Sequence, residues 1–279
     1  MEDAGIRSAA GAETIQLKKI SISAWFRKEH GLAVLITFAM LGLWEILIHL
    51  GMLSPLFFPA PGVIVRTLYR WISSGSLIPH FTASLSRMMA GFAIGAGAGL
   101  LAGLLMGWSE KLRSLADPFV AALHPVPKIA VFPLMMIVLG IGEASKIAVV
   151  AVSAFFPMAI STIAGVRQIR PLYFDVAQNF GAKPLDVFTR VIIPGSLPMI
   201  LSGTRLGLNS SLTITIAAEL VTAQAGLGTL IRMAWETLRT EELYAGLAVI
   251  SALGIAFNLL LHLLTKVLIP WQENREEKG

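Results

Sequence analysis

The chain has 279 residues, of which 55% are hydrophobic and only 14% are charged. Soluble globular domains contain about 25% charged residues, so the composition argues against an ordinary soluble enzyme. Cysteine is absent, which excludes disulfides, thiolate metal sites and a cysteine nucleophile. The histidines are not within metal-ligand spacing of one another, and we predict neither a metal site nor a catalytic cluster. They are His30, His49, His80, His124 and His262.

Six apolar runs are long enough to cross a bilayer, which takes about 20 apolar residues. They occupy residues 31–50, 81–108, 118–140, 145–165, 199–223 and 243–269. The third run is the weakest, because Pro125, Pro127 and Pro133 interrupt it. No small-x-small cleavage site follows the first run, so we expect a retained span rather than a signal peptide. The sequence therefore predicts an all-α membrane protein with a transmembrane domain over residues 31–269.

The distribution of basic residues predicts the orientation of the chain. The net charge of +5 could suggest nucleic acid as a partner, but cytoplasmic loops of membrane proteins are also rich in Lys and Arg. With the N-terminus inside, the inner segments hold 13 of the 22 Lys and Arg residues and the outer segments hold four. We therefore expect residues 1–30 and 270–279 to be cytoplasmic, with no nucleic-acid role.

The second run carries a glycine at every fourth position, which places all five on one helical face. In lipid, such a face lets another helix approach closely enough for backbone contacts. The pattern predicts tight helix packing, either within one protomer or between two. The residues are Gly91, Gly95, Gly99, Gly103 and Gly107.

The inner loop over residues 166–198 has the pattern of a helix-turn-helix. Pro171 suits the first turn of a helix that runs to Phe180, and Gly181 suits its C-terminal break. Pro184 suits the start of a second helix that ends near Pro194. The loop also contains more apolar residues than a solvated loop needs, so we expect a soluble partner to cover part of it.

This loop resembles the signature of the permease subunits of bacterial ATP-binding-cassette importers. That signature is Glu-Ala-Ala, three residues, Gly, nine residues and Ile-x-Leu-Pro. Here conservative replacements occupy the same spacing. The resemblance implies the type I importer permease fold and a coupling helix that docks in a cleft of the ATPase subunit. The matching residues are Asp175, Val176, Ala177, Gly181, Val191, Ile193 and Pro194.

The resemblance also implies the partners. The chain has no Gly-x4-Gly-Lys-Ser/Thr phosphate loop, so ATP is expected on a separate subunit and the chain itself is expected to need no cofactor. The implied assembly contains two copies of the permease, two cytoplasmic ATPase subunits and an external solute-binding protein, in the bacterial inner membrane. An ATP-independent channel, a secondary transporter and a membrane-embedded enzyme are the alternatives.

Further segments resemble the aliphatic-sulfonate, taurine and nitrate branch of these permeases. They are residues 127–134, 140–147, 218–220 and 226–228. This branch is also similar to carriers of cyanate, aromatic acids and vitamin precursors. A small, anionic solute is therefore the expectation, and the particular solute stays open.

The fifth run carries a polar stripe that we predict to line the pore. Polar groups in a membrane helix face the bundle interior or a water-filled path, and interhelical hydrogen bonding is the alternative. A bare carboxylate would repel an anion, so we expect Glu219 to form an ion pair or a gate latch. Lys128 could attract an anion or extend to the membrane surface. The stripe consists of Ser211, Thr215, Glu219 and Thr222.

Overall fold

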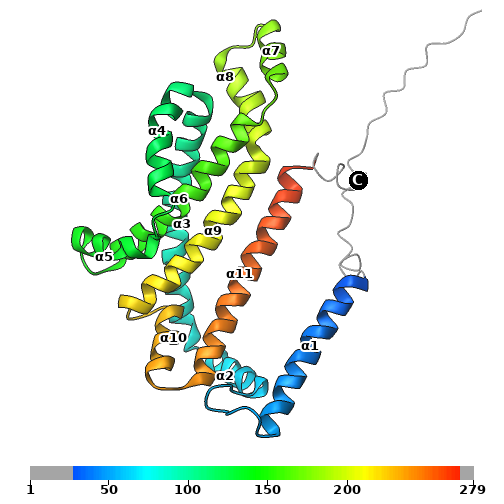
Figure 1. The fold of residues 1–279 in the computed structure, drawn as a ribbon, viewed down its shortest axis with the longest axis vertical. Coiled ribbons are helices and arrows are strands. Elements are labelled where there is room, and N and C mark those ends of the chain that lie inside the picture. Colours follow the sequence, from blue (N-terminus) through cyan, green and yellow to red (C-terminus); the bar gives the residue numbers. More distant parts are fainter. Residues whose placement is uncertain (1–27, 271–279) are drawn as a thin grey trace, which may run out of the picture. The chain divides into compact units, whose positions relative to one another are not determined.

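The computed structural model describes residues 28–270, and its regular elements in that range are all helical (Figure 1). The chain divides into two units, residues 1–52 and residues 53–279. The first unit contains α1 (Lys28–His49). The second contains α2 (Pro61–Ser73), α3 (Leu77–Trp108), α4 (Glu110–Leu123), α5 (Lys128–Leu139), α6 (Glu143–Arg167), α7 (Pro171–Asn179), α8 (Pro184–Val187), α9 (Ile193–Thr222), α10 (Leu227–Glu236) and α11 (Thr240–Leu268). The predicted terminal segments 1–30 and 270–279 lie almost wholly outside the described residues.

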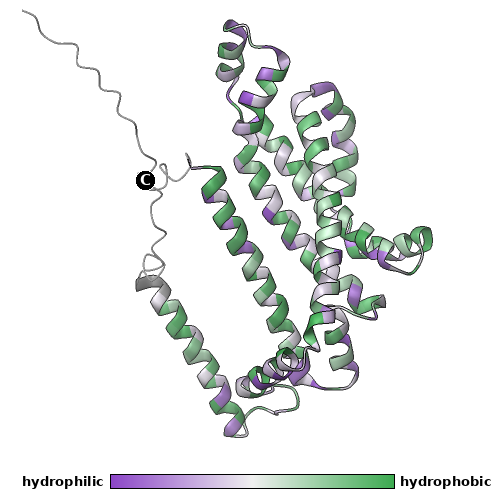
Figure 2. Ribbon diagram, turned by 180° about the vertical axis from the view of Figure 1, so that it is seen from behind, coloured by the Kyte–Doolittle hydropathy of each residue, from purple (hydrophilic) through white to green (hydrophobic). Residues whose placement is uncertain are grey.

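Five helices are long and apolar enough to cross a membrane, and a sixth span results if α4 and α5 count as one. The predicted all-helical membrane fold is thus confirmed, with five or six candidate spans. Figure 2 shows hydrophilic residues gathered in α7 and α8 at one end of the second unit and around α2 and α10 at the other. The middle is mostly hydrophobic, as a lipid-facing band requires.

The third span differs from the straight run predicted at residues 118–140. It consists of α4 and α5, which meet at an angle of 99°. The break contains Pro125 and Pro127, and proline both removes a backbone donor and disfavours helical geometry at the residue before it. The sequence located the break correctly, but the first of the two helices begins well before the predicted start, at Glu110.

The core of the second unit is the packing of α6 against both α3 and α9. Side chains in the middle of α6, including Val149, Val150 and Ala154, are fully buried. The glycine face of α3 lies directly on α6. A Cβ atom built on Gly95 would lie 2.0 Å from the carbonyl oxygen of Ala151. The predicted close packing is confirmed, and it occurs within one protomer.

Substituting Gly95 with valine should therefore force α3 away from α6. Overpacking a core costs about 1–3 kcal/mol, and here the obstacle is backbone, which cannot rotate aside. We expect Gly95→Val to lower the thermal unfolding temperature of the detergent-solubilised protein. Gly97→Val is the matched control, because a Cβ at Gly97 meets nothing within 4 Å. Equal stability of the two variants would contradict this packing.

The helix that begins at Pro184 does not end near Pro194, as the sequence predicted. A π-helical turn over Phe188–Ile192 joins α8 to α9, so the chain stays helical from Pro184 to Thr222. Proline has no N–H to donate and its ring crowds the preceding turn, and a wider π turn accommodates such an interruption. The coupling loop is thus continuous with the fifth span. The sequence analysis also missed α10, which follows that span.

Candidate functional site

The turn between α7 and α8 has the geometry expected of a helix end at glycine. Gly181 has a φ of +71°, a region that residues with side chains rarely occupy. The N–H of Gly181 donates to the carbonyl oxygen of Gln178, and that of Ala182 donates to Ala177, both at 2.9 Å. These bonds satisfy carbonyl groups that the end of α7 would leave unpaired. The predicted break at Gly181 is confirmed.

The tip formed by α7 and α8 presents apolar side chains to solvent. Phe180 is 88% exposed and Leu185 is 73% exposed. Leu172, Tyr173 and Val176 on α7 are also exposed. Exposed apolar groups concentrated at the polar end of a membrane protein mark a protein-binding surface. We refer to the α7–α8 tip, residues 171–187, as the docking tip.

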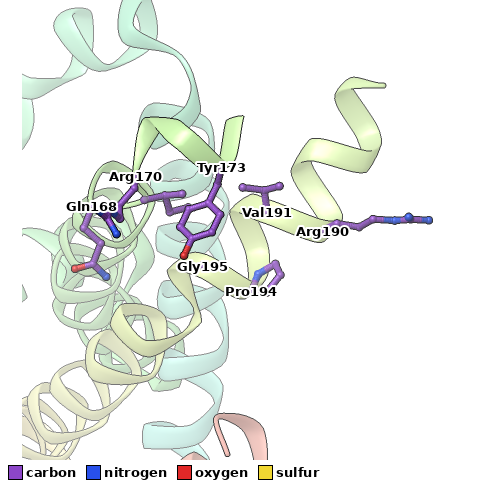
Figure 3. A pocket seen from close by; sticks show the side chains of 8 residues that line it. Gln168, Arg170, Tyr173, Arg190, Val191, Pro194 and Gly195 are labelled. Carbon is purple, nitrogen blue, oxygen red and sulfur yellow. The ribbon is translucent and has the colours of Figure 1, made fainter. Parts of the chain in front are cut away.

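The predicted coupling residues divide into two groups in space. Asp175, Val176 and Ala177 lie on α7, before Gly181. The other three lie where the π turn meets α9, and two of these, Val191 and Pro194, line a cavity of about 430 Å³ beneath α7. In Figure 3 the Tyr173 side chain points toward this cavity, whereas Arg190 points away from it.

The docking tip is anchored to the membrane core by an aromatic stack. The rings of Trp108, at the end of α3, and Phe188 lie 5.3 Å apart between centroids and 23° from parallel. A Cβ on Gly195 would lie 2.9 Å from the Cδ1 of Ile169, so α9 begins in close contact with the chain that leaves α6. These contacts connect the base of the tip to α3, α6 and α9.

A buried ionic cluster lies at the opposite end of the second unit. Glu219 on α9 is fully buried, and its Oε1 accepts a hydrogen bond from Nη1 of Arg87 on α3 at 2.7 Å. The Oγ of Ser84 lies 2.7 and 2.8 Å from the two carboxylate oxygens. The N–H of Gly228 donates to Oε2 at 3.0 Å. We call Ser84, Arg87, Glu143 and Glu219 the Glu219 cluster.

The cluster connects four elements. Arg87 also donates to the carboxylate of Glu143, at the start of α6, and to the carbonyl oxygen of Ala225. Glu143 pairs in addition with Lys146, at 3.1 Å. A Cβ on Gly226 would lie 2.3 Å from the carboxyl carbon of Glu219, so the chain before α10 closes over the acid. The ion pair expected for Glu219 is present.

The sequence analysis missed Arg87, the partner in this pair. The available signal was an arginine inside an apolar run, since a charged residue there must pair or face water. Full burial of Glu219 also leaves it no surface for contact with solute in this conformation.

The other members of the predicted pore stripe lie on the packing face of α9. Ser211 and Thr215 are 0% and 1% exposed, and Thr222 is partly buried. Along α9 the same face continues as Gly203 and Gly207, which contact α6. The three hydroxyl groups have no hydrogen-bond partner among the described residues. Pore lining at these positions stays a prediction.

Lys128 is engaged locally. Its Nζ donates to the carbonyl oxygen of His124 and lies 4.9 Å from the ring centroid of Phe156. A cation over an aromatic face is a stabilising arrangement. Within residues 28–270, no three His, Asp or Glu side chains are grouped to hold a metal ion.

Residues 95–274 match the family described as "Binding-protein-dependent transport system inner membrane component". The match covers more than half of the chain. The chain belongs to this permease family. The taurine transport system permease protein TauC of Escherichia coli (strain K12) is 37% identical over 86% of this chain and 87% of its own length. The putative aliphatic sulfonates transport permease protein SsuC of Bacillus subtilis (strain 168) is 33% identical over 99% of this chain and 98% of its own length.

The fold of the permease also matches a solved importer. A chain of the MetNI methionine ABC transporter, in an inward facing conformation, aligns with a TM-score of 0.61. The alignment covers 69% of the permease and 95% of that chain at 17% identity, so it supports the fold alone. The predicted type I importer fold is confirmed. As a permease subunit, the protein is not an enzyme. ATP hydrolysis belongs to a separate ATPase subunit of the inner-membrane importer. The importer also uses a solute-binding protein.

Removing Arg87 should destabilise the permease strongly. Arg87→Met leaves the buried carboxylate of Glu219 without its cation, and breaking a buried pair in this way costs about 3–5 kcal/mol. The double variant Arg87→Met, Glu219→Met should recover much of the loss, because no charge is then stranded. Thermal unfolding of the purified permease measures both changes.

Arg239→Met is the control for this experiment. Arg239 is largely exposed and pairs with Glu242 at 3.3 Å, and exposed pairs contribute about 0–1 kcal/mol. A loss for Arg87→Met no larger than that of the control would show that the Glu219 cluster does not hold the helices together.

Proposed function

We propose that two copies of this permease form the translocation path of an importer for aliphatic sulfonates, taurine among them. Two relatives above 30% identity, aligned over most of their own length, carry the names of taurine and aliphatic sulfonate transport systems. Nitrate, an anion with the same charge as a sulfonate group, stays an alternative solute.

The exposed apolar docking tip is the observation that carries the coupling role. We infer that Asp175, Val176 and Ala177 enter a cleft of the ATPase subunit, that Gly181 sets the turn, and that the junction with α9 passes on the motion. That junction contains Val191, Ile193 and Pro194. ATP stays on the partner subunit, and the permease itself binds no cofactor.

The proposed orientation places the docking tip and both chain ends in the cytoplasm. The excess of basic residues in the same segments supports it. The Glu219 cluster then lies at the external end, where an ion pair between α3, α6 and α9 can hold the outer side closed. A reporter fused after Gly279 should be cytoplasmic, and one inserted near Ser74 should be external.

Uptake by the reconstituted transporter tests the solute class. The permease, its ATPase and its solute-binding protein are assembled in liposomes and supplied with taurine, ethanesulfonate, nitrate or benzoate. We expect taurine and ethanesulfonate to accumulate only with hydrolysable ATP inside. Accumulation of nitrate or benzoate alone would refute the sulfonate assignment, and uptake without ATP would favour a channel or a secondary transporter.

A side chain with a Cβ at Gly181 tests the docking tip. Gly181→Val should strain the turn by about 1–3 kcal/mol, because a β-branched residue disfavours positive φ. The tip should lose its shape, so that the ATPase dissociates on purification and uptake falls at least severalfold. Gly181→Asn is the control, since asparagine tolerates positive φ. Normal assembly and uptake by Gly181→Val would contradict the coupling assignment.

A further inference from the structure

A second polar stripe runs along α9, on the face opposite the packing stripe. Ser202, Arg205, Asn209 and Thr213 follow one another at spacings of three, four and four, and all four are exposed. The packing stripe of Gly203, Gly207, Ser211 and Thr215 is buried throughout. Either stripe could line the translocation path, but only the second stripe is exposed on the surface of the protomer.

Arg205 lies deep in the membrane span. Gly203 contacts Ser161 of α6, and Gly207 lies beside Ala154. Arg205 therefore lies at the height of the α6 segment between Ala154 and Ser161. At a rise of 1.5 Å per residue, its backbone is about 15 Å from the end of α6 at Arg167, roughly halfway across a hydrocarbon core of about 30 Å.

Arg205 has no counterion in the described part of the protomer. Its side chain makes no hydrogen bond or ion pair among residues 28–270. The sequence of α9 contains no carboxylate before Glu219, and that of α11 contains none after Glu242. An arginine at the centre of a membrane helix is costly to insert and is found facing a bundle interior or a water-filled cavity. Arg205 therefore needs a negative partner that residues 28–270 do not supply.

Helix α11 adds amide groups beside the same stripe. Asn258 Nδ2 donates to the carbonyl oxygen of Gly254 at 2.9 Å and lies 3.5 Å from Oδ1 of Asn209. The oxygen of the Asn209 amide faces Asn258, which leaves its NH₂ group as a free donor. The Cβ position of Gly254 lies 3.5 Å from Leu212, so α9 and α11 are in contact at this level.

We propose that Arg205 and Asn209, with Asn258 beside them, bind the acidic head group of the solute halfway along the translocation path. The guanidinium group offers paired donors to two oxygens of a sulfonate or carboxylate, and the amide of Asn209 offers a further donor one helical turn away. This inference rests on the proposed import of an anion. A site open toward the second copy also explains why four polar residues remain uncovered in one protomer.

Cysteine modification tests this site, because the chain contains no cysteine. Arg205→Cys is assembled with cysteine-free partner subunits, and ethanesulfonate uptake is measured. We expect at least a tenfold loss. Reaction with 2-aminoethyl methanethiosulfonate, which restores a positive charge, should recover at least a third of uptake. Reaction with 2-sulfonatoethyl methanethiosulfonate, which adds a negative charge, should recover none.

The reaction rate of a thiol in Asn209→Cys is an independent test, because this variant retains Arg205. A thiol must be wet to ionise and react, and a nearby cation attracts anionic reagents. We expect the sulfonatoethyl reagent to react faster than the aminoethyl reagent, and the preference to disappear in Arg205→Gln, Asn209→Cys. Saturating ethanesulfonate should slow the reaction at least fivefold. Ser211→Cys and Thr215→Cys, on the packing stripe, should react much more slowly.

The outcomes separate this site from the proposed function. Absence of sulfonate uptake by the unmodified transporter would refute the function, while the charge preference at Asn209→Cys would still report on the site. Three results would overturn the site: normal uptake by Arg205→Cys, recovery that does not depend on the charge of the reagent, or no protection by ethanesulfonate. The last result would indicate that Arg205 meets a carboxylate of the second copy instead. Faster reaction at Ser211→Cys and Thr215→Cys would assign the path to the other stripe.

Discussion

The close approach of α3 and α6 along the glycine face is the contact on which the rest of the permease depends. Apolar side chains gain little from meeting one another in lipid, so close backbone packing has to hold the helices together. The two ends of α3 then become fixed points. Arg87 toward one end reaches Glu219 and Glu143, and Trp108 at the other end stacks on Phe188. The Glu219 cluster and the base of the docking tip are thus positioned by one helix pair.

Local features of the fold were predictable from the sequence, because their causes are local. Gly181 ends α7 since the residue itself permits a positive φ. The glycine spacing identified a packing face, and the prolines marked the break between α4 and α5. The 99° angle at that break and the continuity of α8 with α9 depend on neighbouring helices. Local sequence patterns therefore did not predict them.

The polar residues show where sequence reasoning stops. Periodicity correctly placed Ser211 and Thr215 on one face, but it does not tell which face of a helix its neighbours cover. Arg87 and Arg205 are the same residue type within apolar runs, yet one is buried against Glu219 and the other has no partner in the described protomer. That difference depends on the packing of α3, α6 and α9.

The unbroken helical path from Pro184 to Thr222 has a mechanical consequence. Thirty-nine residues at 1.5 Å each make a rod of about 58 Å, longer than the membrane core that it crosses. The docking tip adjoins one end, and Glu219 lies near the other. A continuous helix of this length can carry a displacement across the bilayer without rearrangement of other helices. In the proposed orientation, a push on the tip would tilt the whole rod and load the salt bridge at its far end, so that salt bridge would set the force needed to open the external side.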